Sequence, residues 1–207
     1  PRCTQTEEGR HEVTTPNTNE RAKRARTWWT SLRPVDTDTL KLPGNRAALA
    51  RLRRCSSPLE AAAEPETAAL FRRLDAHPND IGRIAALASV LAHVRDEPRP
   101  SVRIARAIGA PPGGEPEEAI IKPVRFKTLM SARSDEEVLI AFRRVVALLD
   151  RKANVTNLAE LILGWTDDDR GDRVRTRFAF DYHGAGFAAP DSDSGSDNSD
   201  MNDIQKV

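Results

Sequence analysis

Apolar residues recur along most of this chain three or four positions apart, which is the spacing of one face of an α-helix. The clearest case lies between residues 134 and 150, where one apolar face is formed by Val138, Leu139, Phe142, Val145, Val146 and Leu149. Ser134 stands three residues before Glu137, the spacing of a capping box. Arg144 falls opposite the apolar face and Arg143 on its flank. The stretch therefore predicts an amphipathic helix that buries one side and carries paired arginines away from it.

The same spacing predicts helices along the rest of the chain. The segment 81–94 is apolar nearly all round, which predicts a helix at the centre of a bundle. Further helices are expected to begin at Ser57 and to span 20–33, 46–55, 68–76, 101–108, 125–132, 154–164 and 167–183. No run shows strand alternation bounded by turn residues, so the predicted fold class is all-α.

Polar residues mark the expected starts of several helices. Asn45 is placed to cap the helix at 46–55, and Asn79 or Asp80 the helix at 81–94. Thr166 and Asp169 have the spacing of a capping box for the last helix. Residues 34–44 are expected to form a loop.

Proline and glycine concentrate in residues 109–123, which hold four prolines and three glycines. Such a composition favours a linker between domains. We therefore predict two small helical bundles, at 20–108 and 124–185, joined by this linker. Residues 1–19 and 186–207 are polar and acidic, which predicts disordered ends.

Charge is distributed unevenly along the 207 residues, although the net charge is only +1. Residues 21–185 carry 29 Lys and Arg against 22 Asp and Glu, a net of +7, while the first 20 residues carry −2 and the last 22 carry −4. A basic folded region favours an anionic partner such as nucleic acid.

Arginines gather on the polar sides of three predicted helices. The helix at 46–55 carries Arg46, Arg51, Arg53 and Arg54 with no acidic residue among them, so no ion pair within the helix neutralises them. The last helix carries a stripe of Arg170, Arg173 and Arg177. Such faces are either solvated and paired with acids from elsewhere, or they bind phosphates. Trp28 and Trp29 fall at helical spacing and are expected in the core, with base stacking as the alternative.

No pattern in the sequence favours catalysis. The four histidines are scattered, Cys55 has no evident histidine partner, and the acids at 167–169 with Asp172 match no calcium loop. Phosphate-cradling and nucleophile-elbow motifs are absent from the sequence. We therefore expect a binding protein that uses no cofactor and no metal. Two cysteines, no apolar run of membrane length and no secretory signal favour the cytoplasm.

An ordered set of motifs resembles a known family. It begins with Trp28-Trp29, continues through Leu52-Arg53-Arg54, Phe71 with Leu74, Val124-Arg125-Phe126, Phe142-Arg143-Arg144-Val145 and Trp165, and closes with Arg177-Phe178-Ala179-Phe180-Asp181-Tyr182. The set is similar to the small subunit of the type I-E CRISPR Cascade complex, the CasB family, over residues 21–184. Thr128, Phe178 and His183 depart from the residues common in the family.

The resemblance implies a non-catalytic prokaryotic protein that packs with a second copy of itself and with other Cascade subunits. Its basic face would hold the displaced DNA strand and stabilise the duplex of guide RNA and target DNA. The basic positions that match the family are Arg54, Arg83, Arg125, Arg133 and Arg144. Their basic neighbours Arg53, Lys127 and Arg143 complete the candidate set.

Two other functions fit the same residues. A helical adaptor would use its arginine faces to bind acidic protein partners. A stand-alone DNA-binding protein would need a recognition helix after a tight turn if it read sequence, and no such pair of helices stands out.

Overall fold

A computed structural model describes residues 17–36 and 41–185 of the chain. Of the ends predicted to be disordered, 1–16 and 186–207 lie outside these residues, whereas 17–19 are described and begin the first helix, with Asn17 as its cap. In chain order the elements are α1 (Thr18–Leu32), β1 (Val35–Asp36), β2 (Lys41–Leu42), α2 (Arg46–Arg54), α3 (Pro58–Ala62), α4 (Pro65–Arg73), the 3-10 turn η1 (Pro78–Asp80), α5 (Ile81–His93), α6 (Ile104–Ile108), the 3-10 turn η2 (Pro116–Glu118), α7 (Pro123–Met130), α8 (Asp135–Leu148), α9 (Val155–Trp165) and α10 (Gly171–Tyr182). The all-α prediction is confirmed.

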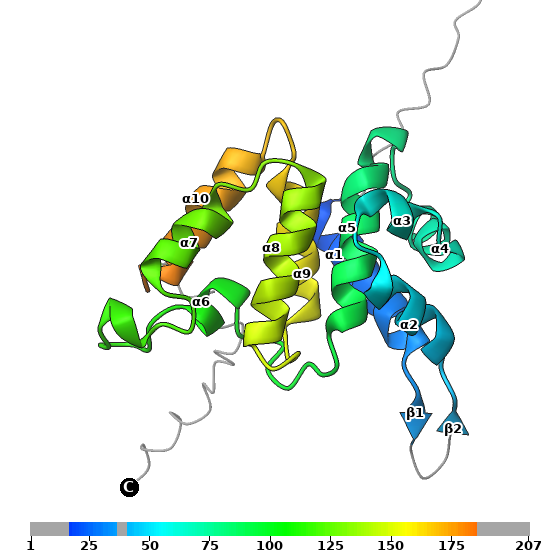
Figure 1. Ribbon diagram of the computed structural model, residues 1–207, viewed down its shortest axis with the longest axis horizontal. Coiled ribbons are helices and arrows are strands. Elements are labelled where there is room, and N and C mark those ends of the chain that lie inside the picture. The colour runs from blue at the N-terminus through cyan, green and yellow to red at the C-terminus, as the bar shows by residue number, and fades with distance from the viewer. Residues whose placement is uncertain (1–16, 37–40, 186–207) are drawn as a thin grey trace, which may run out of the picture.

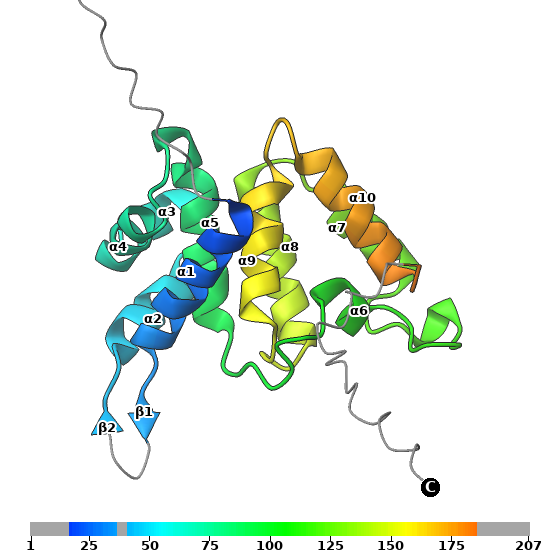
Figure 2. The same ribbon diagram turned by 180° about the vertical axis from the view of Figure 1, so that it is seen from behind.

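The helices form two layers, which can be told apart by comparing the opposite views in Figures 1 and 2. Helices α7, α8 and α2 lie toward the viewer in Figure 1, and α1, α9 and α10 lie toward the viewer in Figure 2. The most extensive contacts join α1 to α9 and α5 to α8, so helices of the N-terminal and C-terminal halves pack directly on each other. Within the described residues, no helix is long and apolar enough to cross a membrane.

The core centres on α5, as its nearly all-apolar sequence predicts. Every residue from Ile84 to Ala92 is buried. Several of these are alanines, which let α2, α3, α8 and α9 approach closely. Trp28 and Trp29 are also core residues at 3% exposure, and their indoles donate hydrogen bonds to the Glu66 and Val94 carbonyls at 3.1 and 3.4 Å.

One hydrophobic cluster contains buried residues from both halves of the chain. The segment 109–123 attaches to this core at its end, where Ile121 N donates to Ile108 O at 3.1 Å and the Tyr182 hydroxyl donates to Ile121 O at 2.6 Å. The division into two bundles and a linker stays a prediction.

Aromatic packing fixes α7 and α8 against the C-terminal helices. The Phe126 ring stacks on Tyr182 with centroids 3.8 Å apart, and the Phe142 ring meets Trp165 edge-on at 5.1 Å. Because these contacts hold both helices by their apolar faces, their polar faces are left outward.

The capping box at Ser134 is confirmed. The Ser134 hydroxyl accepts a hydrogen bond from Glu137 N at 3.2 Å, and the Glu137 carboxylate accepts one from Ser134 N at 3.1 Å. The predicted apolar face of α8 is buried, with Leu149 half-buried at the end of the helix. Asn45 caps α2 as predicted, since its side chain accepts from Ala48 N at 3.0 Å.

Two other predicted caps were wrong. Asp80 stands before α5 but makes no capping bond, because its carboxylate pairs with Arg21 and Arg83. Thr166 does not cap the last helix either, because its hydroxyl donates to Asp135 at 2.8 Å, and α10 begins only at Gly171. In both cases long-range polar partners outcompete the local cap.

Several boundaries also differ from the sequence prediction, and the helix expected at 101–108, for example, begins only at Ile104. The loop expected at 34–44 contains a hairpin of two-residue strands, with Val35 opposite Leu42 and Asp36 opposite Lys41. Helix α4 starts at Pro65, earlier than residue 68, because proline is favoured in the first turn of a helix.

Candidate nucleic-acid interface

Arg143 is one of the predicted binding residues, and the structure places it inside the fold. Its guanidinium donates to the carbonyls of Leu52 and Cys55 and to the Ser89 hydroxyl, so it joins α8 to α2 and α5. Burial lowers the pKa of Arg143 below its ordinary value. This side chain therefore ties three helices together through its Nη2, while its Nε is buried without a hydrogen-bond partner among the described residues.

Arg53 is also anchored within the protein. Its Nε donates to Ala92 O at 2.6 Å, and the side chain is half-buried. Burial lowers the pKa of Arg53, and the nearby charges of Arg95 and Arg151 lower it further. The remaining N–H groups of this guanidinium make no hydrogen bond among the described residues.

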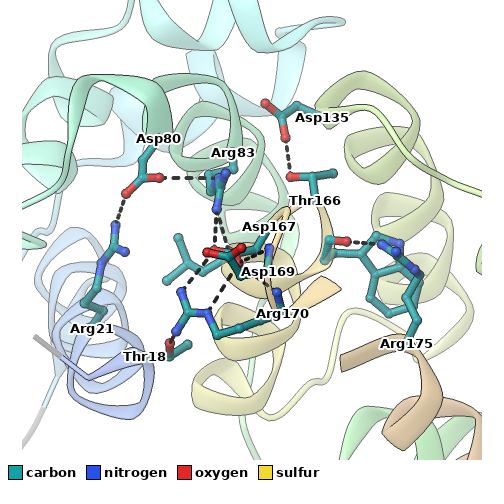
Figure 3. Close-up of polar contacts among 12 residues, drawn as sticks. Thr18, Arg21, Asp80, Arg83, Asp135, Thr166, Asp167, Asp169, Arg170 and Arg175 are labelled. Carbon is teal, nitrogen blue, oxygen red and sulfur yellow. Dashed lines mark hydrogen bonds and ion pairs between the residues drawn. The ribbon is translucent and has the colours of Figure 1, made fainter. Parts of the chain in front are cut away.

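Arg83 belongs to a chain of alternating charges that Figure 3 shows. Its Nη1 donates to Asp167 Oδ2 at 3.1 Å, and its Nε lies 3.5 Å from Asp80 Oδ1. Arg21 extends the chain at one end through Asp80 at 2.7 Å, and Arg170 extends it at the other through Asp167 at 3.0 Å. Arg170 and Arg83 hold the pKa of Asp167 at about 2. Arg83 thus links α5 to the turn between α9 and α10.

Arg133 caps the end of α7. Its Nη1 donates to the carbonyls of Met130 and Ala132 at 2.6 and 3.0 Å. These carbonyls belong to the last turn of α7 and the residues after it, where a cation is favoured by the helix dipole. Arg133 remains exposed, so the local hydrogen bonds fix its position without burying it.

The other four predicted residues are exposed, and no hydrogen bond or ion pair from their side chains is found among the described residues. They are Arg54 on α2, Arg125 and Lys127 on α7, and Arg144 on α8. Arg125 and Arg144 flank a groove of about 580 Å³ between α7 and α8. The floor of this groove is apolar and includes Leu129, Val145 and Leu148. The four exposed cations are therefore the part of the candidate set that is available to an anionic partner.

Two further arginines join the candidate surface although no motif or helical spacing in the sequence points to them. Arg95 follows α5 and Arg151 follows α8, and Arg95 N donates to Arg151 O at 2.7 Å. Both side chains are exposed. The arginine-rich junction, defined here as Arg53, Arg95, Arg143 and Arg151, therefore gathers at the ends of α2, α5 and α8. Only tertiary contacts bring these residues together, so no local spacing predicts the junction.

The pKa of His93 responds to the positive charge of the junction. It ends α5 and is half-buried. Its pKa is lowered to about 4, first by burial and then by the charges of Arg143, Arg151 and Arg53. Carbonyl oxygens such as Ala92 O and Leu52 O accept hydrogen bonds from this positive charge, and the Glu60 carboxylate offsets part of the charge of Arg143.

The third basic helix, α10, lies in the other layer. It faces the viewer in Figure 2, whereas α7 and α8 face the viewer in Figure 1. Arg170 on this stripe is engaged by Asp167 and by the Thr18 hydroxyl, while Arg173 and Arg177 are exposed. The structure thus brings the α2 and α8 arginines to a shared junction and leaves the α10 stripe apart from it. Within the described part of the chain, no group of three His, Cys, Asp or Glu side chains is arranged to hold a metal ion.

A family model described as CRISPR-associated protein Cse2 matches residues 48–183. The match runs from α2 to α10 and covers about two thirds of the chain. The chain belongs to the Cse2 family. The resemblance to the small subunit of type I-E Cascade, predicted from the ordered motifs, is thereby confirmed, and this Cse2-family chain is a subunit of a CRISPR Cascade complex. Comparison with curated proteins and comparison with solved structures gave no match.

All eight predicted residues of this Cse2-family chain fall within the matched region. Helix α1, with Trp28 and Trp29, precedes it. The packing of α1 along α9 nevertheless makes this helix part of the same core.

Proposed function

We propose that this Cse2-family chain is a non-catalytic subunit that holds the displaced DNA strand and stabilises the duplex of guide RNA and target DNA. The observation that carries the proposal is a set of exposed cations that have no carboxylate partner among the described residues. The set consists of Arg54, Arg95, Arg125, Lys127, Arg144 and Arg151. That the Cse2 family is a structural component of Cascade supports the non-catalytic part of the proposal.

The chemistry of these side chains suits a strand of arbitrary sequence. Contacts to phosphate oxygens position a nucleic acid without reading its bases. The arginine guanidinium is planar and grips two phosphate oxygens at once. Because the cations project from helices packed on one core, or from residues that follow those helices, the spacing of their backbone positions is fixed before the strand arrives, which limits the entropy lost on binding.

The anchored arginines have a supporting role in this proposal. Arg143 joins α8 to α2 and α5, and Arg83 joins α5 to the turn before α10. They maintain the arrangement of the helices that carry Arg54 and Arg144. Charge reversal at the exposed residues should therefore affect binding without affecting folding.

The proposal includes protein partners, namely a second copy of the chain and other Cascade subunits. Exposed apolar side chains on and before α7 and α8 support such contacts, since Val124 is 77% exposed and Ile120 and Leu148 are 47% and 43% exposed. Large apolar side chains at the surface are common at protein–protein interfaces when they form a patch.

Charge reversal in reconstituted Cascade tests the proposal. The combined change Arg54→Glu and Arg144→Glu should weaken binding of a single-stranded DNA that mimics the displaced strand by about tenfold or more, because phosphate contacts are replaced by repulsion. The matched control is Arg73→Glu with Arg173→Glu, which reverses two exposed arginines on α4 and α10.

The control should retain most of the affinity, and both double variants should keep the helicity and melting temperature of the unmodified chain. An equal loss of affinity in the control would mean that net charge alone governs binding. A collapse of melting in the first variant would mean that Arg54 and Arg144 are structural.

A further inference from the structure

A groove beside the junction is lined by four arginines. It lies between the end of α1, the helix α2 and the two residues that follow α5, and has a volume of about 290 Å³. The arginine groove, as we name it, consists of Arg33, Arg46, Arg53 and Arg95 around an apolar floor that includes Leu49 and Val94. No acidic side chain is among the described residues that line it.

Internal contacts hold two of these guanidinium groups in place. Arg33 lies over the Trp29 ring, with its central carbon 4.5 Å from the ring centroid, a cation–π contact. Arg53 is fixed by the bond from its Nε to Ala92 O, which leaves its terminal N–H groups without a partner among the described residues. The backbone of Arg95 is held by the bond from its N–H to Arg151 O. The fold thus positions the guanidinium groups of Arg33 and Arg53 and the backbone of Arg95.

Among the described residues that line the groove, no carboxylate balances the positive charge. Arg53 and Arg95 are close enough for their charges to repel, and Arg151 adds to this repulsion. Carbonyl oxygens at helix ends offset only part of it, because each carries a partial charge. A bound oxyanion would accept hydrogen bonds from the fixed guanidinium groups and reduce the repulsion between them.

We propose that the arginine groove is a binding site for a single phosphate group, separate from the exposed arginines on α7 and α8. The volume admits a phosphate group and excludes a folded segment. The flat guanidinium groups, two of them held in place, offer the forked donors that phosphate oxygens accept. The apolar floor limits access of water from one side, which strengthens each charged hydrogen bond.

The phosphate has two possible sources, a free inorganic anion and the backbone of a bound strand. The second source rests on the proposed function, and there the groove fixes one point of the strand while the α7 and α8 arginines contact the rest. The first source does not depend on strand binding at all. The two sources share the same chemistry at the groove.

Nuclear magnetic resonance of the full chain, titrated with inorganic phosphate at constant ionic strength, tests the site. The Arg53 Nε–H and Trp29 Nε1–H signals should shift along a saturable single-site curve. Arg95→Gln should weaken this binding by about tenfold, because it removes a charged donor. The fold should be unaffected, since the side chain at position 95 is exposed and the backbone bond to Arg151 O is kept. Arg73→Gln, an exposed arginine on α4, is the matched control and should leave the curve unchanged.

A linear shift of these signals without saturation, or a saturable shift that survives Arg95→Gln, would overturn the proposal. Arg46→Gln supplies a second variant at an exposed residue of the groove and should also weaken binding. If Arg95→Gln failed to fold, an unchanged curve with Arg46→Gln would overturn the proposal by itself.

Adding oligothymidylate separates the two sources. Competition between oligothymidylate and phosphate for the Arg53 signal supports the strand as the source. Saturable phosphate binding that oligothymidylate leaves unchanged supports a free anion at the same site. Strand binding by the chain with no phosphate response would leave the proposed function standing and overturn the groove.

Discussion

Arg143 and Arg144 are consecutive residues of α8 with opposite surroundings. Arg143 reaches inward to α2 and α5, and Arg144 is exposed at the groove between α7 and α8. The sequence placed both away from the apolar face, and that much follows from helical spacing. Helical spacing does not predict which helices contact Arg143, because α2 and α5 are distant in the chain and only the fold brings them to this residue.

This pair allows a structural role to be separated from a binding role. Arg143→Gln should lower the free energy of unfolding by about 1–3 kcal/mol, since it leaves buried carbonyl and hydroxyl groups without a charged donor. Arg144→Gln should change it by no more than about 0.5 kcal/mol and should weaken DNA binding. Chemical denaturation of both variants measures the difference, and equal destabilisation would refute the assignment.

The end of α5 illustrates how an element concentrates charge. His93 closes the helix, and the charges of Arg53, Arg143 and Arg151 surround it. In the folded chain the pKa of His93 is about 4 against an ordinary value of 6.5, so between these pH values only the unfolded chain takes up the proton. Stability is therefore unaffected above pH 6.5 and falls as the pH drops toward 4.

His93→Gln should remove much of this fall. The free energy of unfolding of the unmodified chain, measured by denaturation, should be lower at pH 4.5 than at pH 7. In the variant this decrease should be smaller by about 1–2 kcal/mol, a figure that allows for the partial exposure of the ring. Asp167 does not interfere in this window, because its pKa of about 2 makes its contribution disappear only below pH 3.8. An identical pH dependence in both proteins would contradict the assignment to His93.

At the scale of elements, the sequence predicts helices where apolar spacing and a local cap agree. Ser134 and Asn45 act on their own helices, and both caps are present in the structure. Asp80 and Thr166 carry the same local signal but bond to residues far along the chain, Arg21 and Asp135 among them. The local sequence predicts which residues can cap a helix. The hydrogen-bond partner that a polar side chain takes in the structure depends on the fold as well.

At the scale of the molecule, the candidate surface was predictable in part. Exposed arginines on polar helix faces, such as Arg54, Arg125 and Arg144, follow from periodicity together with the family resemblance. Arg95 and Arg151 lie after helix ends, where no periodicity applies, and their backbone contact appears only in the fold. The relation of α10 to α8 likewise depends on how the layers pack, because nothing in the sequence of either helix fixes its layer (Figures 1 and 2).

The central claim is that exposed arginines on this Cse2-family chain hold a strand through its phosphates. The salt dependence of oligothymidylate binding by the full chain tests it most directly, since each phosphate contact on a single strand contributes roughly 0.7 to the log–log slope. About five contacts predict a slope of around −3 to −4, falling in magnitude to around −2 when Arg54 and Arg144 are replaced by glutamine. A slope near −1 for the unmodified chain would contradict the claim.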